Sequence, residues 1–191
     1  MKVYFTASLR GVQYYERYYK QISEEIVKLG HQHLDDEIFT LNRAKYYNEL
    51  ETSGRESHVK LYQKKILALQ TAEICIFEVS FNSLSIGYQI EKSLYYHKPT
   101  IVLYLEDSIP YFFDGIEHEK LILKSYKEET LSDVLKQAFT EAQHKKEQRF
   151  NFFISPALIN YLDESSKKLG MTKSVYIRTL IEEDMKRRSV K

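Results

Sequence analysis

The chain has 191 residues, enough for one domain of ordinary size and a small second unit. Its 28 Lys and Arg against 27 Asp and Glu give a formal net charge of +1, so bulk charge indicates neither a nucleic acid nor a membrane surface as partner. The single cysteine, Cys75, excludes an internal disulfide framework, and no apolar run approaches the ~18 residues of a membrane helix. The sequence therefore predicts a soluble, cytoplasmic protein that spans no membrane.

The first predicted strand covers residues 2–7, and a helix that ends at Gly30 follows it. Apolar side chains recur at spacings of three and four along this helix: Tyr15, Tyr18, Tyr19, Ile22, Ile26 and Leu29. The loop between the two elements carries Ser8, Arg10 and Gly11. An arginine beside a serine and a glycine at the end of a strand is typical of a phosphate ligand, with an ordinary surface arginine as the alternative.

The next stretch, residues 31–57, is mostly polar. It holds His31, His33, Asp35, Asp36 and Glu37, whose spacing matches no known metal site, so we expect neither a metal nor a cofactor. A solvated loop, or a strand edge that gives one carboxylate such as Asp36 to a pocket, explains the cluster better. Residues 48–57 are predicted to form a flexible lid or excursion.

The middle of the chain contains a helix and a second strand-to-helix connection. Residues 58–70 are helical, with Val59, Tyr62, Ile66 and Leu69 on one face. A buried strand at residues 74–79 then leads into a polar loop, and Gly87 is expected to open an amphipathic helix that continues to Tyr96. Free N–H groups and the helix dipole at such a helix start favour an anion, although a plain turn capped by serines is the alternative.

The two strand-to-helix loops would meet if their strands are parallel neighbours, because open α/β folds bind ligands at the carboxyl edge of the sheet. Further buried strands are predicted at residues 99–105 and, as a short edge strand, at 121–123. A helix over residues 130–146 has Leu131, Val134, Leu135 and Ala138 on its inner face. This alternation of strands and helices predicts an α/β fold with a parallel sheet that is covered on both faces.

Four segments resemble the nucleoside 2-deoxyribosyltransferase superfamily, and within it the 2'-deoxynucleoside 5'-monophosphate N-glycosidases. They are YFTASLRG at residues 4–11, the strand from AE at 72–73 to FEVS at 77–80, NSLSIGYQ at 82–89, and KP at 98–99. The resemblance covers residues 1–146 and implies a flavodoxin-like domain, commonly dimeric, that binds a nucleotide and cleaves or exchanges its N-glycosidic bond. The nucleotide-binding residues that it implies are Tyr4, Ser8, Arg10, Gly11, Asp36, Ser83, Ser85, Gly87 and Gln89.

Two positions depart from the pattern of this superfamily. Gln89 stands where the family has its nucleophilic glutamate, and ungapped alignment places Lys65 where the family has a catalytic aspartate. A neutral amide cannot attack the anomeric carbon, although it can hydrogen-bond a ribose hydroxyl. Glu78, Asp36 and Glu37 are candidate substitutes, with Glu78 the first to test, but none lies at the expected position. The catalytic residues are therefore unknown, and loss of the family reaction is the prediction.

Residues 147–191 form a sequence of a different kind. Residues 149–154 alternate as in a strand, and Ser155 followed by Pro156 predicts a helix start. This helix would end at Gly170, and Thr172 would cap a second helix. One strand and two short helices cannot bury a core by themselves. The segment resembles a ribbon-helix-helix module, in which two chains pair their strands, and this predicts a homodimer or higher homo-oligomer.

The ribbon-helix-helix resemblance also implies DNA as a partner, because in that family the paired strands enter the major groove. The corresponding residues are Arg149, Asn151 and Phe153 on the strand, with Lys173 and Ser174 at the phosphate-binding helix start. Residues 149–191 carry nine Lys or Arg against five acids, a modest excess of +4. Phe153 does not read bases by hydrogen bonds; it would contact a thymine methyl, or the face would bind protein instead. A module that only dimerises the chain is the alternative.

Two functions follow from these observations. The favoured one is a nucleotide-binding, catalytically impaired protein whose tail acts as a nucleotide-responsive DNA-binding regulator. The alternative is an active N-glycosidase or 2-deoxyribosyltransferase whose tail only oligomerises it.

Overall fold

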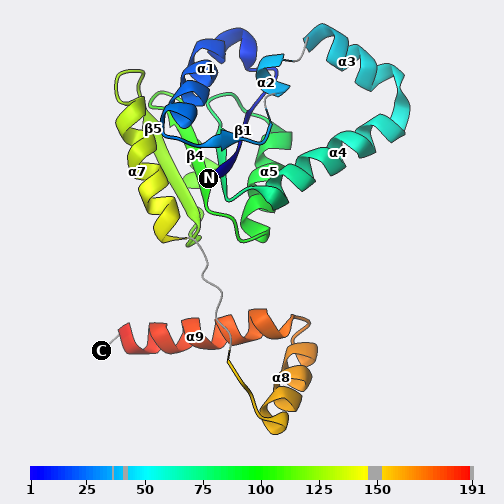
Figure 1. Cartoon of the computed structure of the whole chain (residues 1–191), viewed down its shortest axis with the longest axis vertical. Coiled ribbons are helices and arrows are strands. Elements are labelled where there is room, and N and C mark those ends of the chain that lie inside the picture. The colour runs from blue at the N-terminus through cyan, green and yellow to red at the C-terminus, as the bar shows by residue number, and fades with distance from the viewer. Residues whose placement is uncertain (36, 41–42, 146–151, 190–191) are drawn as a thin grey trace. The chain divides into compact units, whose positions relative to one another are not determined.

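The computed structural model describes residues 1–35, 37–40, 43–145 and 152–189. Contacts divide the chain into two compact units, Met1–Glu147 and Gln148–Lys191 (Figure 1). Among the described residues, the first unit holds a five-stranded sheet and the second holds two helices. None of the described helices is long and apolar enough to cross a membrane.

The sheet is parallel throughout. Its strands are β1 (Lys2–Ala7), β2 (Gln32–His33), β3 (Ile74–Glu78), β4 (Thr100–Leu105) and β5 (Leu121–Tyr126), in the order β2-β1-β3-β4-β5. This is the strand order of flavodoxin-like doubly wound folds. The predicted parallel α/β sheet is therefore confirmed, and β5 extends three residues beyond the short edge strand that the sequence predicted.

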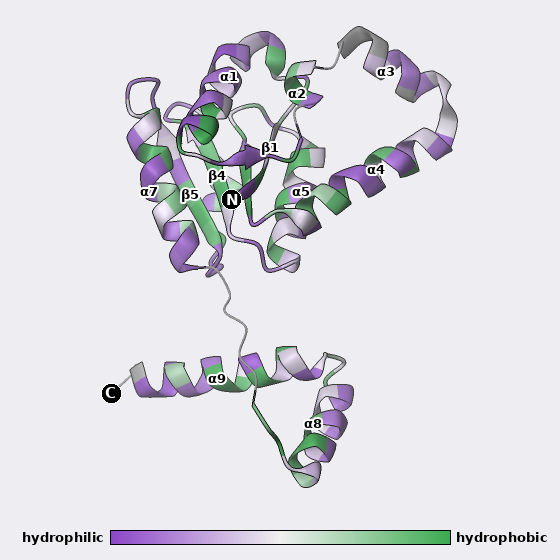
Figure 2. Ribbon diagram, viewed as in Figure 1, coloured by the Kyte–Doolittle hydropathy of each residue, from purple (hydrophilic) through white to green (hydrophobic). Residues whose placement is uncertain are grey.

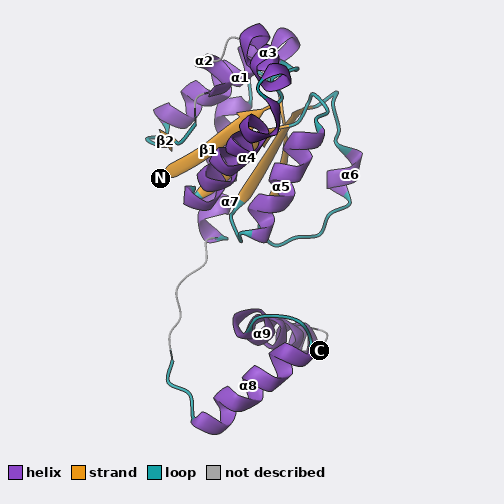
Figure 3. Ribbon diagram, turned by 90° about the vertical axis from the view of Figure 1, so that its right-hand side faces the viewer, coloured by secondary structure: helices purple, strands orange, loops and turns teal. Residues whose placement is uncertain are grey.

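Helices cover both faces of the sheet, as Figure 3 shows. On one face, α1 (Val12–Lys28) and α7 (Leu131–His144) bury a cluster that includes Phe5, Ile22 and Leu135. On the other, α4 (Gly54–Thr71) and α5 (Leu84–Tyr95) bury Tyr4 with Leu69, Ile90 and other apolar side chains. Successive residues of β1 thus point to opposite faces of the sheet. Green marks the central strand β4 in Figure 2, because a central parallel strand is buried on both sides.

The described residues of the first unit also form three shorter helices: α2 (Glu37–Thr40), α3 (Arg43–Thr52) and α6 (Tyr111–Asp114). The α3 helix and the start of α4 extend away from the sheet in Figure 1, as expected of an excursion. Nearly all of residues 48–57, which the sequence predicted to form a flexible lid or excursion, lie in α3 and α4. Gly54 permits the sharp change of direction between the helices, since its φ of +70° is in the left-handed region.

The described part of the second unit contains α8 (Pro156–Lys168) and α9 (Lys173–Ser189). The side chain of Ser155 caps α8 by accepting a hydrogen bond of 3.4 Å from the backbone N–H of Leu158. Gly170 turns the chain with a φ of +65°, and Thr172 Oγ1 accepts a hydrogen bond of 3.3 Å from Val175 N. Residues 152–155 form no strand in this single chain, and residues 149–151 of the predicted strand lie outside the described residues. The ribbon-helix-helix arrangement therefore stays a prediction.

Candidate functional site

The candidate site lies where the β1–α1 and β3–α5 loops leave neighbouring strands. The paired strands β1 and β3 end together, with Ala7 opposite Glu78. From β1 the chain crosses to β2 on one side, and from β3 it crosses to β4 on the other, so this is the point at which the strand order reverses. Open α/β sheets bind their ligands in the crevice at such a point.

The two loops pack directly against each other around Gly11. A Cβ atom at this residue would lie 2.4 Å from the hydroxyl oxygen of Tyr19 and 2.8 Å from Cβ of Phe81. Gly11 is therefore required by close packing, not by backbone conformation, since its φ of −74° suits any residue. The ring of Phe81 also stacks on Tyr14 of α1, with ring centroids 6.0 Å apart.

The sequence-predicted phosphate ligands lie on these loops. Ser8 is buried and Arg10 is exposed, and the N–H of Gly11 donates to the carbonyl of Ser8 over 2.9 Å. On the other loop, Ser83 Oγ lies 3.1 Å from Ser85 Oγ. Serine hydroxyls can donate hydrogen bonds to an anion, and an arginine adds a positive charge. Ser8, Ser83 and Ser85, with Arg10, are therefore suitable ligands for a phosphate.

The helix α5 begins at Leu84, three residues earlier than predicted, because Ser83 adopts an extended conformation and acts as the N-cap residue. Its side chain makes no capping hydrogen bond, and the intrahelical bonds begin with Gly87 N donating to Ser83 O over 3.0 Å. Gly87 therefore lies within the first turn and does not open the helix. The N–H groups that precede it point out of the helix end, where they favour a negative charge.

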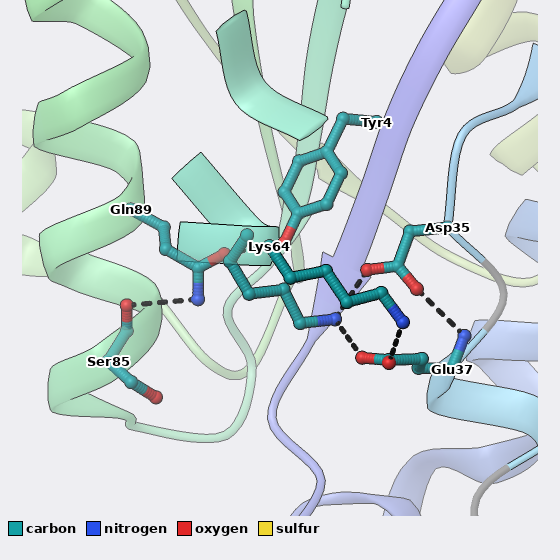
Figure 4. A network of polar contacts seen from close by, with 7 residues as sticks. Tyr4, Asp35, Glu37, Lys64, Ser85 and Gln89 are labelled. Carbon is teal, nitrogen blue, oxygen red and sulfur yellow. Dashed lines mark hydrogen bonds and ion pairs between the residues drawn. The ribbon is translucent and has the colours of Figure 1, made fainter. Parts of the chain in front are cut away.

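Gln89 lies one turn further along α5 and contacts Tyr4 of β1 (Figure 4). Its Oε1 accepts a hydrogen bond of 2.6 Å from the Tyr4 hydroxyl, and its Nε2 donates to the carbonyl oxygen of Ser85 over 3.3 Å. Burial is the main cause that raises the pKa of Tyr4 well above its usual value, and the negative charge of Asp35 is the second cause. Tyr4 is therefore a neutral hydrogen-bond donor that holds the amide of Gln89 in one orientation.

Charged residues cluster beside this pair, as Figure 4 shows. Lys65 forms ion pairs with Asp35 and with Glu37, the latter at 2.6 Å between Nζ and Oε2, and Lys64 also pairs with Glu37. Burial raises the pKa of Glu37, but hydrogen bonds from the two lysines outweigh it, and the net pKa lies below the usual value. Glu37 is thus an ionised carboxylate already engaged by lysines. Asp36, the other acid expected here, lies outside the described residues.

Glu78, the first candidate substitute for the missing nucleophile, is completely buried at the end of β3. Its Oε1 accepts hydrogen bonds from Ser80 N at 3.2 Å, from the Ser80 hydroxyl, and from the Tyr126 hydroxyl at 3.3 Å. Its Oε2 is buried without a hydrogen-bond partner among the described residues. Burial raises the pKa of Glu78 to about 7. Because its side chain has no exposed surface, the Glu78 carboxyl group cannot contact a sugar unless the segments that bury it move.

A pocket that the sequence did not indicate lies beside the start of α5. It has a volume of about 390 Å³ and is lined by residues 79, 81–83, 86–87 and 109–113. Residues 106–116 gave no periodic pattern, and the signal that could have marked them is the aromatic run Tyr111-Phe112-Phe113 after a proline. Another hollow of about 450 Å³ lies along α1, but long charged side chains surround it and no predicted site residue lines it.

The described residues bring no three His, Cys, Asp or Glu side chains close enough together to hold a metal ion. In the second unit, Phe153 is fully exposed and Ser174 is exposed, whereas Lys173 Nζ pairs with Asp163 Oδ1 at 2.9 Å. Arg149 and Asn151, the two proposed base readers, lie outside the described residues. The structure therefore does not test the DNA-binding prediction.

Comparison with known proteins gave no matching family model. The chain is 26% identical over 148 residues to a protein of Nematostella vectensis named "Putative 2'-deoxynucleoside 5'-phosphate N-hydrolase 1", covering 73% of this chain and 94% of that protein. A protein of the same name from Thermofilum pendens (strain DSM 2475 / Hrk 5) is 26% identical over 133 residues, covering 66% of this chain and 85% of the relative. The chain is thus similar to nucleotide N-hydrolases. This similarity agrees with the resemblance of residues 1–146 to the deoxyribosyltransferase superfamily.

The chain also matches the solved structure of a CMP N-glycosidase of Clostridium botulinum. The matched region covers 73% of this chain and 99% of the chain in that structure. Its sequence identity to this chain is 14%, and the TM-score is 0.46.

Proposed function

We propose that the sheet unit binds a nucleoside 5'-phosphate at the crevice between β1 and β3. The phosphate would lie on Ser8, Arg10, Ser83, Ser85 and Gly87, with Tyr4, Gly11 and Gln89 around the rest of the nucleotide. Support comes from the contact between the two loops at Gly11 and Phe81, and from the uncapped start of α5. The names of the curated relatives supply the ligand class, a 2'-deoxynucleoside 5'-phosphate.

The second part of the proposal is that this site binds its ligand without the N-glycosidic cleavage of the superfamily. The main observation behind this proposal is that a glutamine, Gln89, stands at the nucleophile position of the superfamily. Its amide is held by hydrogen bonds with the Tyr4 hydroxyl and the Ser85 carbonyl. An amide has no carboxylate lone pair with which to form a glycosyl-enzyme bond. Lys65, at the second expected carboxylate position, is itself paired with Asp35 and Glu37. Both acids of the family pair are thus replaced, while the loops remain suitable for a phosphate.

The third part concerns the tail, which we assign to self-association and DNA binding as a nucleotide-responsive regulator. Several of its apolar side chains are more than half exposed in the single chain: Phe152, Phe153, Leu158, Leu169, Ile181 and Met185. Apolar surface of this kind is usually covered by a partner, and a second copy of the same unit would provide a self-complementary one. The charge of +4 over residues 149–191 favours DNA as a further partner.

One alternative remains, because the curated relatives are named as hydrolases. A displaced carboxylate would then carry the reaction, and the tail would only join the subunits.

Isothermal titration calorimetry of the intact protein with the four 2'-deoxynucleoside 5'-monophosphates tests the binding proposal. We expect at least one to bind, and the corresponding nucleoside, which lacks the phosphate, to bind much more weakly. Charge-assisted hydrogen bonds contribute roughly 1.5–3 kcal/mol each, so loss of the phosphate should lower affinity by at least about tenfold. Equal affinity for nucleoside and nucleotide would contradict a phosphate site on these loops.

A further inference from the structure

The carboxyl group of Glu78 lies where both loops of the candidate site begin. Glu78 is the last residue of β3 and pairs with Ala7 at the end of β1. Its side chain points to the same sheet face as that of Ile76, the face that α1 and α7 cover. The carboxyl group has no exposed surface, so it can influence a bound ligand only through other residues.

One oxygen of this carboxyl group holds the start of the β3–α5 loop. Glu78 Oε1 accepts hydrogen bonds from the N–H of Ser80 at 3.2 Å and from the Ser80 hydroxyl. The hydroxyl oxygen of Ser80 in turn accepts a hydrogen bond of 2.8 Å from the N–H of Leu105, at the end of β4. The loop is thus fixed to two strands at Ser80, three residues before the proposed phosphate ligand Ser83.

The hydroxyl of Tyr19 connects the same carboxyl group to the β1–α1 loop. Tyr19 is buried in α1, and its hydroxyl lies directly against Gly11 of that loop. The Tyr19 hydroxyl and Glu78 Oε2 are both buried without a hydrogen-bond partner among the described residues. The two groups interact, because the charge of Glu78 is the second cause, after burial, that raises the pKa of Tyr19. A hydrogen bond between them would satisfy both atoms.

Within this cluster, Glu78 is the group that changes charge near neutral pH. The polar groups that face it are those of Ser80, of Tyr19 on α1 and of Tyr126 at the end of β5. Burial is the main cause that raises the pKa of both tyrosines above the usual value, so both stay neutral. Burial also raises the pKa of Glu78, to about 7.

We propose that Glu78 is a positioning residue of the phosphate site, which as a neutral acid holds the starts of both loops and thereby links nucleotide binding to its proton. The proposal rests on the proposed nucleotide-binding function and adds a residue that controls binding without touching the ligand. An ionised Glu78 opposes binding in two ways. Burial destabilises its charge unless the segments that cover it move, and the charge repels an anionic phosphate on the loops.

The linkage has a definite sign and an upper limit. Above the pKa of Glu78, a nucleotide binds to the protonated form and one proton is taken up from solvent to convert the carboxylate to the acid. Linkage to one proton changes affinity by at most about tenfold per pH unit. We therefore expect affinity to fall by about fivefold or more between pH 6 and pH 8 because of Glu78 alone.

Calorimetric titrations at pH 6, 7 and 8 test this linkage, with the tightest-binding of the four 2'-deoxynucleoside 5'-monophosphates as the probe. The variant is Glu78→Gln, whose uncharged amide keeps an oxygen acceptor for Ser80. The affinity of the unmodified protein relative to this variant should fall by about fivefold or more from pH 6 to pH 8. Taking this ratio cancels the titration of the nucleotide phosphate, whose second pKa is about 6.

Proton uptake is measured on the unmodified protein itself. Titrations at pH 8 in two buffers with different ionisation enthalpies give the number of protons taken up per nucleotide bound. At this pH the phosphate is already fully ionised, so the nucleotide contributes little. We expect net uptake by the unmodified protein and none by Glu78→Gln. This measurement does not depend on the folding of any variant.

Tyr126→Phe gives a readout that a purely structural role of Glu78 would not change. The Tyr126 hydroxyl donates to Glu78 Oε1 over 3.3 Å, and this hydrogen bond lowers the pKa of Glu78. Its loss should therefore move the fall in affinity to higher pH. Tyr104→Phe is the matched control, because Tyr104 packs against the cluster on the opposite face of the sheet. The control should leave the pH dependence unchanged.

Three results would overturn the proposal. If the two affinities have the same pH dependence and the unmodified protein takes up no proton at pH 8, Glu78 does not control binding, although the nucleotide site stands. If Glu78→Gln loses the same fraction of affinity at every pH, its role is structural alone. If the unmodified protein binds no nucleotide at any of these pH values, the proposed nucleotide-binding function fails, and this proposal fails with it.

Discussion

The buried carboxyl group of Glu78 provides the most quantitative prediction. It lies at the end of β3 with no exposed surface, and burial, the largest effect, raises its pKa to about 7 from the ordinary 4.5. Hydrogen bonds from Ser80 and Tyr126 lower the pKa but do not offset burial. We predict that Glu78→Gln removes a pH-dependent loss of stability, because an uncharged amide resembles the protonated acid.

The direction of the change in stability with pH depends on whether the folded or the unfolded chain keeps the proton of Glu78. Below pH 4.5 the carboxyl group is protonated in both states and makes no difference to stability. Between pH 4.5 and about 7 the unfolded chain releases the proton while the folded chain keeps it, so the free energy of unfolding falls as the pH rises. Above about 7 the loss is complete. At roughly 1.36 kcal/mol per pKa unit, the difference between 7 and 4.5 corresponds to about 3 kcal/mol.

Urea unfolding of both proteins at pH 5, 6, 7 and 8 measures this effect. The stability of Glu78→Gln relative to the unmodified protein should rise by about 2.5 kcal/mol between pH 5 and pH 8, because all other titrating groups contribute equally to both proteins. Glu119→Gln, at an exposed carboxylate, is the control. A difference between Glu78→Gln and the unmodified protein that is the same at pH 5 and pH 8 would show that Glu78 is not held as a neutral acid.

Three further predictions concern the phosphate site and the tail. Arg10→Ala should weaken nucleotide binding by about tenfold to a hundredfold in calorimetry, since a charge-assisted contact contributes roughly 1.5–3 kcal/mol, whereas Arg17→Ala on the exposed face of α1 should not. Phe152→Asp should shift the protein toward monomers in sedimentation velocity while the sheet unit stays folded; unchanged assembly would contradict dimerisation through the tail. Arg149→Ala should lower DNA affinity without altering assembly, and binding of the unmodified protein should fall steeply with salt. Ordered dimers that bind no DNA would leave the tail with an assembly role alone.

The sequence predicted β1, β3, β4 and β5 because these strands contain short apolar runs bounded by turn residues. It did not predict β2, the polar pair Gln32–His33, as a strand. It placed the start of α5 at Gly87, since a glycine after a polar loop is typical of a helix boundary, whereas the extended backbone of Ser83 starts the helix earlier. The helices over residues 48–57 were not predicted from the sequence for a similar reason. Polar residues around a glycine also occur where two helices meet at a sharp turn, as at Gly54.

The parts of the site that the sequence missed depend on contacts between distant segments. Glu78 looked like an available acid, but Ser80 and Tyr126 enclose it, and no local pattern marks Tyr126 as its partner. The pairing of Lys65 with Asp35 and Glu37 joins α4 to the segment after β2 in the same way. The pocket next to α5 requires the segment 109–113 to fold back beside Phe81, which only the three-dimensional arrangement shows.

The most direct test of the central claim is a proton NMR time course on the intact protein mixed with stoichiometric 2'-deoxynucleoside 5'-monophosphate. Broadening or shifting of the nucleotide signals reports binding, and the H1' and base signals of the same sample report whether the glycosidic bond survives. The proposed function predicts perturbed nucleotide signals from the first spectrum and no free base over many hours. Steady appearance of free base, in an amount that scales with protein concentration, would contradict the claim that the replacement of the family glutamate by Gln89 leaves a binding site without catalysis.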